Sequence, residues 1–492
     1  MNAQHFDVLI IGAGLSGIGT ACQVSAEHPN KTIAVLERRE RLGGTWDLFR
    51  YPGIRSDSDM YSFGYKFRPW QELKVLADGP SIRQYIADTA AEYGIDKKIH
   101  YGLKIVRADW STTDSRWTLT ALHEATGERR IYTAGFLVSC TGYYNYDAGF
   151  LPTLPGADQF KGQTIHPQHW PENLDYTGKK VVVIGSGATA VTLIPAMAGD
   201  AEHVTMLQRS PSYIFSVPAF DKISEVLGRF LPAKWVWTSA RKRNIAIQRF
   251  IYVASKRWPA QMRRLLLWQV RRHVGPSFDM SHFTPKYMPW DERLCAVPNA
   301  DLFKVLTSGE ASIVTDQIDT FTEKGILLKS GRELEADIIV TATGLNIQML
   351  GGMELFVDGE SRQFRDHMTY RGVLVENIPN LAWVFGYTNA PWTLKSDIAG
   401  AYLCRLLKHM EDNGHAVTTP CDDEDSALDI GMLDQLQSGY VQRAKDTLPR
   451  QGSKNPWRVL MHYKQDSKML LHDPVDDGLL RFDTVAMEAI AV

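Results

Sequence analysis

The sequence predicts an α/β fold with two dinucleotide-binding, Rossmann-like domains and a helical insertion in the second. Two short apolar strands each run into a glycine-rich turn, one at residues 12–17 and the other at 185–190. A strand, a glycine turn and a helix in this order begin a parallel βαβ unit. Between residues 217 and 285 the α/β pattern stops, and Arg, Lys and Trp recur at helical spacing. The chain has 492 residues, which is too long for one core, so several domains are expected.

The first glycine-rich turn follows the apolar strand at residues 6–11 and reads GAGLSG. Gly12 permits the tight turn, Gly14 lets the backbone approach a pyrophosphate, and Gly17 lets the helix pack on the strand. The helix that begins near Ser16 points its N-terminal amides at the phosphates. A glycine turn without a ligand is the simpler interpretation, but the order of strand, turn, helix and acidic strand end favours a dinucleotide site.

The second turn follows the strand at residues 180–184 and reads GSGATA, so the same reasoning applies to it. Its candidate cofactor-binding residues are Gly185, Ser186, Gly187 and Thr189.

The tips of the two following strands distinguish the two turns. The strand at residues 32–36 ends in Glu37, placed to accept a hydrogen bond from a ribose hydroxyl, which favours FAD or NAD. The strand at residues 203–207 leads to Arg209 and Ser210. Without an acid at this strand end a 2′-phosphate is not repelled, and the Arg209 guanidinium is a planar cation that can bind it. The second site is therefore expected to take NADPH, although Arg209 as a solvated surface charge is the alternative.

Composition excludes several other classes. A formal net charge of −2 argues against a nucleic-acid partner. The five cysteines are scattered without a CxxC pair, which fits a reducing cytoplasm and gives no disulfide reductase centre. No metal site is expected, and no apolar run approaches the ~20 residues needed to span a bilayer. The start of the chain shows no secretory pattern.

Two further stretches carry a more specific signal. Residues 43–57 read GGTWDLFRYPGIRSD and residues 160–171 read FKGQTIHPQHWP. Surface loops with glycine turns are the simpler interpretation. Both stretches nevertheless resemble fingerprints of the type I Baeyer–Villiger monooxygenases. The FxGxxxHxxxWP fingerprint matches at Phe160, Gly162, His166, Trp170 and Pro171. Nearly the whole chain is similar to this family, most of all to its ethionamide-activating type.

The resemblance implies roles for individual residues. It favours FAD over NAD at the first site, with Thr45, Trp46, Arg55 and Asp57 as cofactor-binding residues. Trp46 is expected at the flavin and Asp57 in the active site. Val106 is expected to meet the adenine through its backbone. His166 and Trp170 are expected to couple the domains and not to act on the substrate.

The resemblance also implies a reactive cation. The segment at residues 289–295 reads PWDERLC, and Arg293 matches the basic residue that reaches the flavin and pairs with the Asp57 carboxylate. Glu292 stands where the family commonly has Lys, which leaves Arg209 and Ser210 to hold the 2′-phosphate.

The implied reaction is Baeyer–Villiger oxygenation. NADPH reduces FAD, O2 gives a C4a-peroxyflavin, and one oxygen atom is inserted beside a ketone carbonyl to give an ester or lactone. A fixed guanidinium favours the anionic oxidant. Oxidation of organosulfur substrates, thioethers and thiocarbonyls, is a side activity implied by the same chemistry. Two alternatives stay open: an N- or S-oxygenating flavin monooxygenase, and a non-catalytic flavoprotein that senses NADPH.

We expect a discontinuous FAD-binding domain at residues 1–145 plus 375–492. The expected NADP-binding domain covers residues 146–216 plus 286–374, with the helical insertion at 217–285. The insertion has two interpretations: helices packed over the NADP-binding domain, or a basic face in peripheral membrane contact. The protein is expected to be cytoplasmic, with membrane association as the alternative. The sequence leaves the oligomeric state open.

Overall fold

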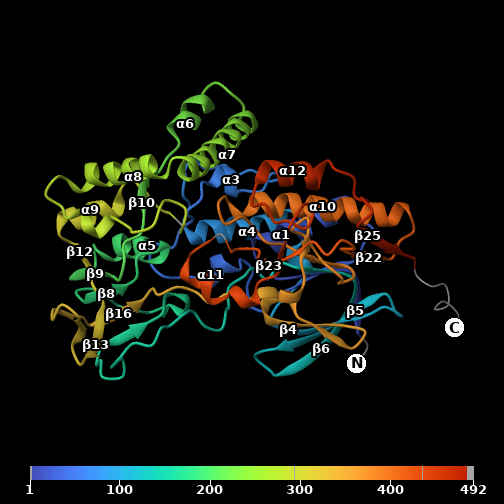
Figure 1. Cartoon of the computed structure of the whole chain (residues 1–492), viewed down its shortest axis with the longest axis horizontal. Helices are drawn as coiled ribbons and strands as arrows, with labels where there is room; N and C mark the ends of the chain where they lie inside the picture. The colour runs from blue at the N-terminus through green and yellow to red at the C-terminus, as the bar shows by residue number, and fades with distance from the viewer. Residues whose placement is uncertain (1–2, 293, 435, 485–492) are drawn as a thin grey trace.

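The computed structural model describes residues 3–292, 294–434 and 436–484. It confirms the α/β class, with two sheets that lie toward opposite ends of the long axis (Figure 1). The first sheet holds the N-terminal strand, and the second sheet holds the strands around residues 163–341. Helices cover the sheets and the large cavity lies between the two halves.

The first sheet has a parallel centre because its strands are apolar on both faces and are covered by helices. Strand β1 pairs in parallel with β2 and β6, and β6 continues into the antiparallel β5 and β4. Its strands are β1 (Gln4–Ile11), β2 (Ile33–Leu36), β3 (Ile99–His100), β4 (Leu103–Ser111), β5 (Arg116–His123), β6 (Glu128–Ser139), β17 (Glu354–Val357), β18 (Glu360–Arg362), β19 (Thr369–Tyr370), β20 (Leu374–Val375) and β21 (Leu381–Trp383). The helices that pack with it are α1 (Leu15–Glu27), α4 (Gly79–Glu92), α10 (Trp392–Asp412) and α12 (Tyr463–Leu471).

The second sheet is parallel throughout its described strands, in the order β12-β9-β8-β16-β7. The strands are β7 (Gln163–Ile165), β8 (Lys180–Ile184), β9 (His203–Gln208), β12 (Ala311–Thr315) and β16 (Ile338–Thr341). Helices α5 (Ala188–Met197) and α9 (Asp301–Ser308) pack on it, and a small antiparallel sheet of β13 (Ile318–Thr322), β14 (Gly325–Leu328) and β15 (Glu333–Glu335) adjoins it.

The chain returns to the first sheet earlier than residue 375, where the second part of the FAD-binding domain is expected to begin. Strand β17 pairs in parallel with β4, and β18 pairs with β17. Strand β19 joins the same sheet through β20. Residues 354–370 therefore lie in the first sheet, although the expected division assigns them to the NADP-binding domain.

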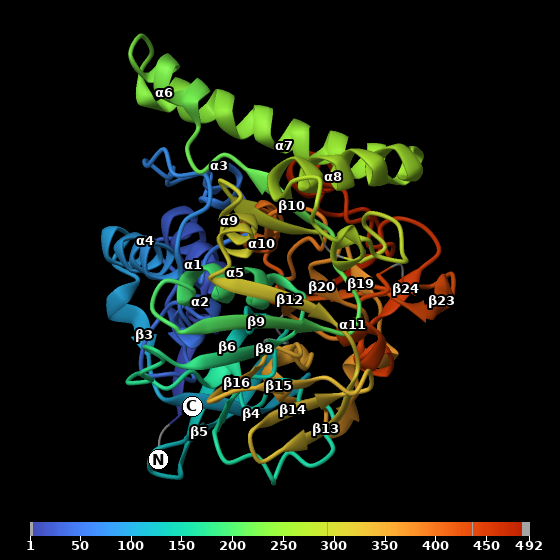
Figure 2. The same cartoon turned by 90° about the vertical axis from the view of Figure 1, so that its left-hand side faces the viewer.

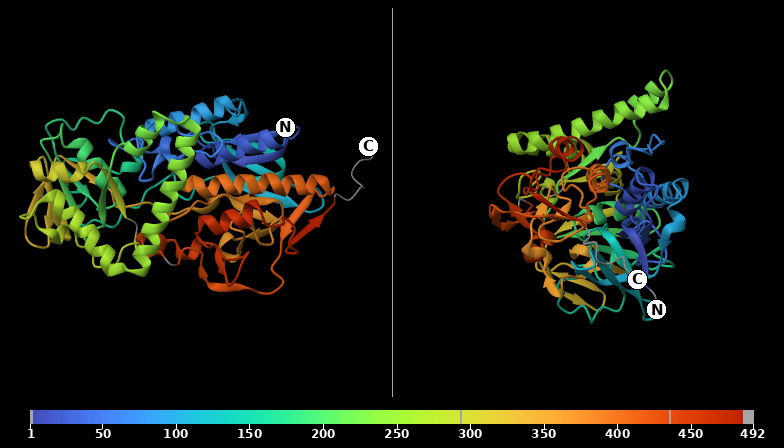
Figure 3. Two further views of the ribbon diagram at one scale, coloured as in Figure 1. Left: turned by 90° about the horizontal axis from the view of Figure 1, so that it is seen from above. Right: turned by 90° about the vertical axis from the view of Figure 1, so that its right-hand side faces the viewer.

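Helices occupy most of the region between residues 217 and 285: α6 (Lys222–Gly228), α7 (Ala233–Arg257) and α8 (Pro259–Val274), followed by η3 (Met280–Phe283). Figures 2 and 3 show α7 lying across one side of the molecule, with α6 beyond it. Trp237 and Arg241 are buried, whereas Trp235 and Phe250 are exposed. Within the described ranges, none of the helices combines the length and apolar character needed to cross a bilayer.

The remaining elements are short and connect these parts. They are α2 (Thr45–Leu48), α3 (Met60–Phe63), α11 (Gly439–Arg443), β10 (Ile214–Val217), β11 (Cys295–Pro298), β22 (Val417–Pro420), β23 (Ala427–Gly431), β24 (Arg450–Gly452), β25 (Leu480–Asp483), η1 (Asp96–Lys98), η2 (Pro167–His169), η4 (Met349–Gly352), η5 (Phe364–Asp366) and η6 (Lys445–Thr447).

Candidate functional site

One large cavity of about 1430 Å³ lies between the halves of the molecule. It brings together residues that are far apart in the sequence, from the first glycine turn, the loop at 43–59, the start of α5, helix α7 and the start of α10. The residues expected at the site that line it are Gly12, Gly14, Ser16, Glu37, Thr45, Trp46, Arg55, Asp57 and Thr189. A cavity of this size is large enough for an extended cofactor and a substrate.

The first glycine turn leaves no room for a side chain at Gly12 or at Gly17. Gly12 has φ +100°, and a Cβ there would lie 2.6 Å from the carbonyl oxygen of Cys140. A Cβ on Gly17 would lie 1.8 Å from the carbonyl oxygen of Gly12. Only glycine allows this strand, turn and helix to pack so closely, and the bare backbone of the turn faces the cavity.

Glu37 ends β2 and its carboxylate is buried beside the first turn. It accepts hydrogen bonds from the backbone N–H of Ala13 at 2.6 Å and of Arg39 at 2.8 Å. Burial raises the pKa of this carboxyl, and the two N–H donors oppose that shift. The carboxylate thus holds the turn in shape and also lines the cavity where a ribose is expected.

Aromatic side chains form part of the cavity wall near the first turn. Trp392, the first residue of α10, donates from Nε1 to Ser16 Oγ at 2.8 Å. Its ring stacks on Tyr143 with centroids 5.2 Å apart. Trp46 contacts Phe63 edge to face at 5.8 Å. These rings give the cavity rigid apolar walls suited to a planar ligand.

The loop at residues 51–57 joins the first half of the molecule to the second. Gly53 has φ +76°, and a Cβ there would lie 2.7 Å from the carbonyl oxygen of Thr192 in α5. The Arg55 guanidinium donates from Nη1 to Asp301 of α9 at 2.6 Å. Burial raises the pKa of Tyr51 to about 12, so its phenol stays protonated at the junction.

Arg55 also supplies a test of whether an anionic cofactor fits. Its Nη2 atom is buried and has no hydrogen-bond partner in the described part of the chain. Arg55 lines the cavity, so this donor is available to an acceptor placed there. Together with the bare glycine backbone it fits a ligand that carries phosphate or carbonyl oxygens.

Asp57 lies exposed in the cavity wall and accepts a hydrogen bond from Ser58 Oγ at 3.3 Å. Arg293, its expected partner, lies outside the described residues. The neighbouring Leu294 and Trp290 line the cavity.

The second glycine turn is more open than the first. Gly185 has φ +145°, and a Cβ there would lie 2.4 Å from the carbonyl oxygen of Ala342, but a Cβ on Gly187 would meet nothing within 4 Å. Ser186 Oγ donates to the carbonyl oxygen of Ser210 at 3.1 Å. The turn itself lies outside the cavity wall, which it reaches only through the start of α5 in the described structure.

Arg209 and Ser210 are exposed just after β9, at the tip where a 2′-phosphate is expected. Burial raises the pKa of the Glu292 carboxyl, and the nearby Arg209 charge opposes the shift. Glu292 therefore competes with any bound phosphate for the same guanidinium.

The fingerprint at residues 160–171 contributes no residue to the cavity wall that the structure describes. Phe160 is buried, and a Cβ on Gly162 would lie 2.3 Å from the carbonyl oxygen of Asp337. His166 Nδ1 accepts from the N–H of Gln168 at 3.2 Å, and its Nε2 lies 3.3 Å from the carbonyl oxygen of Gly344. Burial lowers the pKa of His166. Trp170 and Pro171 are half-buried beside this loop.

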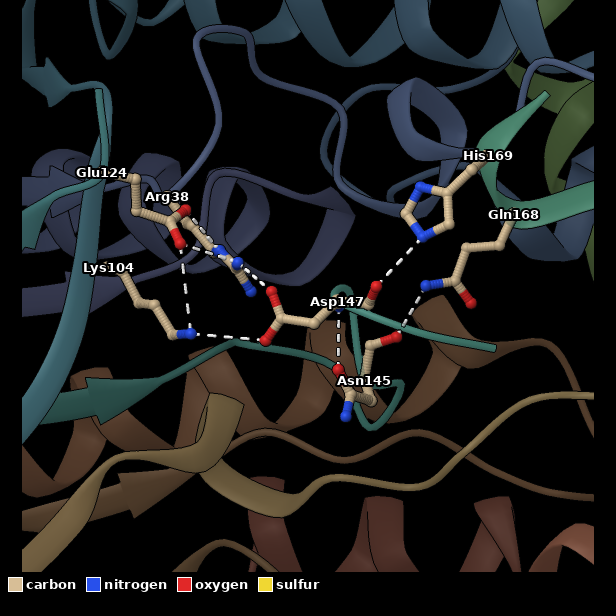
Figure 4. A network of polar contacts seen from close by, with 7 residues as sticks. All are labelled: Arg38, Lys104, Glu124, Asn145, Asp147, Gln168 and His169. Atoms are coloured by element: carbon tan, nitrogen blue, oxygen red, sulfur yellow. Dashed lines mark hydrogen bonds and ion pairs between the residues drawn. The ribbon is translucent and has the colours of Figure 1, made fainter. Parts of the chain in front are cut away.

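A polar network joins this fingerprint to the first half of the molecule (Figure 4). Asp147 pairs with Arg38 and lies 3.3 Å from Lys104 Nζ, and both cations line the cavity. The Arg38 hydrogen bond lowers the pKa of the Asp147 carboxyl. On the other side, His169 Nε2 lies 3.2 Å from the carbonyl oxygen of Asp147, and Gln168 donates to the carbonyl oxygen of Asn145 at 2.8 Å.

Helix α7 supplies cavity residues that the sequence did not indicate. Asn244 and Gln248 line the cavity, and their amides donate to the buried Asp59 carboxylate at 2.8 Å and 2.6 Å. Their spacing of four residues was the available signal, since it places both on one face of a helix. Val106, expected near the adenine, is at an irregularity of β4, where the wall is formed by the preceding residues 103–105.

Comparison with known proteins identifies the family of the chain. The profile of the flavin-binding monooxygenase-like family matches residues 6–350. The chain is 73% identical over 492 residues to the MymA monooxygenase of Mycobacterium tuberculosis, named as FAD-containing, covering 99% of each chain. It is 50% identical over 481 residues to the FAD-containing monooxygenase EthA of Mycolicibacterium smegmatis, covering 97% of each.

The fold also matches the solved structure of an oxidised steroid monooxygenase bound to NADP. The TM-score is 0.71 at 22% identity, and the match covers 85% of this chain and 88% of that one. The expected relationship to flavin monooxygenases is confirmed. The chain belongs to the flavin-binding monooxygenase-like family.

Proposed function

We propose that this chain is an FAD-dependent, NADPH-consuming Baeyer–Villiger monooxygenase that converts ketones to esters or lactones, with oxidation of thioethers and thiocarbonyls as a further activity. The observation that carries the proposal is the single cavity lined by the first glycine turn, the loop with Trp46, Arg55 and Asp57, and the start of α5. A flavin on the first turn and a nicotinamide near α5 would share this volume. The names of MymA and EthA support FAD as the cofactor.

Bound FAD, once reduced by NADPH, would supply the activated oxygen for transfer from O2 to the substrate. Gly12 and Gly14 would hold the pyrophosphate through their backbone, and Glu37 would accept from the ribose. The Trp46 and Trp392 rings would pack beside the flavin system. Arg209 and Ser210 would bind the 2′-phosphate of NADPH.

In the proposed active site, Arg293 would stabilise negative charge on the oxidant and on the oxyanion that forms when the ketone carbonyl is attacked. The Asp57 carboxylate would hold that guanidinium in position. Closure of the apolar walls would exclude water from the reacting atoms. The fingerprint residues would couple the two domains through the network around Asp147.

The proposal is tested with the Arg293→Ala variant. We expect it to retain FAD and to oxidise NADPH, while ester formation falls on the order of 10²–10³-fold, as for removal of one oxyanion donor. Gas chromatography of products from linear, cyclic and aryl ketones measures the effect. Arg293→Lys is the control, because it keeps the charge and should keep part of the activity. Ester formation at the normal rate in Arg293→Ala would contradict the role.

Product identity separates the alternatives. Conversion of a thioether or an amine without conversion of any ketone would indicate an N- or S-oxygenating enzyme. Failure to oxidise NADPH with any of these substrates would indicate a non-catalytic flavoprotein.

A further inference from the structure

The helices of the insertion carry an unusual surface. Between residues 222 and 274 there are thirteen Lys and Arg residues against one Glu, although the whole chain has a net charge of −2. The exposed residues of α7 recur every three or four positions, which places them along one side of the helix. We call this set, with the exposed stripe of α8, the outer surface: Trp235, Ser239, Lys242, Ala246, Phe250, Val253 and Arg257 of α7, and Arg264, Leu265, Trp268 and Arg272 of α8.

Several large apolar side chains on this outer surface are exposed to solvent. Trp235 is 69% exposed, Phe250 is 67% exposed and Trp268 is 54% exposed. Isolated exposed apolar residues are common, but a row of aromatic side chains along adjoining helices marks an interaction site. Figures 1 and 2 place α6, α7 and α8 on the same side of the molecule.

The cations between these aromatic residues are available to a partner. Lys242, Arg257, Arg264 and Arg272 make no ion pair with any carboxylate of the described residues. The Arg272 guanidinium lies 5.1 Å from the Trp268 ring centroid. Aromatic and aliphatic side chains interleaved with unpaired Lys and Arg match the boundary between anionic headgroups and acyl chains.

Helices α6 and α7, with Phe220 just before α6, also line the cavity. Phe220, Ile223 and Ile247 line the cavity and are 57%, 58% and 48% exposed. We call these three residues the apolar rim. Ile247 lies next to Ala246 and three residues before Phe250 of the outer surface on α7. An apolar rim at the cavity, beside the outer surface, would give a lipid-soluble molecule a path that avoids water.

We propose that the outer surface docks on an anionic lipid bilayer, so that the apolar rim faces the acyl chains and admits membrane-dissolved substrates to the cavity. The docking rests on the surface alone, and the entry of substrates rests also on the proposed function. A second copy of this chain is a poorer occupant, because two such basic surfaces would repel each other. Nucleic acid would use the cations but would leave the aliphatic rim in water.

Vesicle sedimentation of the full-length, FAD-loaded protein tests the docking without any substrate. We expect binding to vesicles of phosphatidylglycerol mixed with phosphatidylcholine, little binding to phosphatidylcholine alone, and release as salt is raised. The charge variant Lys242→Glu/Arg257→Glu and the aromatic variant Trp235→Ser/Phe250→Ser should each weaken binding about tenfold or more. Leu151→Ser/Lys161→Glu, also exposed but outside these helices, is the matched control and should bind normally.

Unchanged FAD content and thermal unfolding show that each variant is folded. Vesicle binding of either variant at the wild-type level would overturn the proposal. A wild-type protein that does not bind anionic vesicles would also overturn it. A change of oligomeric state in the aromatic variant without vesicle binding by the wild type would assign the surface to a second copy. Tighter binding to single-stranded DNA than to vesicles would assign it to nucleic acid.

The position of the apolar rim is tested separately. All five cysteines are buried, so an environment-sensitive dye can be attached to Ile247→Cys alone. Anionic vesicles should shift its emission to the blue, while the same dye on Leu151→Cys should not respond. A dye on Ile247→Cys that stays in water while the protein is bound to vesicles would overturn the path from lipid to cavity.

Discussion

The two glycine-rich turns have similar sequences but different surroundings. At the first turn, a Cβ on Gly12 or Gly17 would meet a backbone carbonyl oxygen, and the buried Glu37 fixes the loop through two N–H donors. At the second turn Gly185 is blocked by backbone as Gly12 is, but a Cβ on Gly187 would meet nothing within 4 Å, and Arg209 and Ser210 stand exposed at the strand tip. Sequence likeness alone therefore does not determine how tightly a turn is built.

The difference fits two ways of holding a ligand. A turn closed by backbone and buried acid is suited to a cofactor that stays with the protein through many turnovers. An open turn with exposed cations is suited to a coenzyme that binds and leaves in each cycle, because exposed charges speed association. Three experiments can break or sharpen this contrast.

The largest effect is expected when a methyl group is added to each turn. Gly17→Ala places a Cβ 1.8 Å from the carbonyl oxygen of Gly12, so the turn must open and folding with FAD should fail. Gly187→Ala meets nothing within 4 Å, so its thermal unfolding should stay close to that of the wild type. Differential scanning fluorimetry and FAD content measure both. The two positions are not equivalent, because the second turn already has Ala190 where the first has Gly17. Equal losses in the two variants would contradict the difference in packing at Gly17 and Gly187.

The next largest effect is expected on the binding of NADPH, through Arg209 at the exposed end of β9. Arg209→Ala should raise KM for NADPH about ten- to hundredfold, the effect of one charge-assisted contact, and leave KM for NADH unchanged. Glu292→Gln is the companion variant: it removes the competing carboxylate and should lower KM for NADPH. Steady-state kinetics with both coenzymes measure the change. An Arg209→Ala variant with unchanged preference for NADPH would place the 2′-phosphate elsewhere.

The smallest effect is expected on the pH dependence of unfolding, through His166, which lies between the two turns in the sequence. Burial lowers its folded-state pKa below the ordinary value of about 6.5, so the unfolded chain binds a proton more readily. The free energy of unfolding should therefore fall as pH drops through this region. The fall should be steeper in the wild type than in His166→Gln, because the other histidines are common to both proteins. Thermal unfolding from about pH 7.5 to 5.5 measures the difference. Parallel curves would show that His166 does not contribute.

The sequence predicted the local units of the fold well. Strand, turn and helix at β1 to α1 and at β8 to α5 follow from short apolar runs that end in glycine, because these patterns act within a few residues. Nine of the expected site residues, four of them from the stretch at 43–57, line one cavity.

The sequence did not predict which distant segments pair or pack together. Strand β17 is short and begins with a Glu, so nothing local indicates that it pairs with β4 about 250 residues earlier. Asn244 and Gln248 lie in a helix rich in cations, and their contact with Asp59 depends on how α7 packs. The exposure of Trp235 and the burial of Trp237 likewise follow from tertiary packing and not from composition.

The network around Asp147 has one more consequence. Its ion pairs with Arg38 and Lys104 are partly open to solvent, and mobile ions weaken such pairs over a Debye length of about 8 Å at physiological ionic strength. The polar contact between the halves of the protein therefore weakens as ionic strength rises, whereas the hydrophobic packing within each half is not screened in this way.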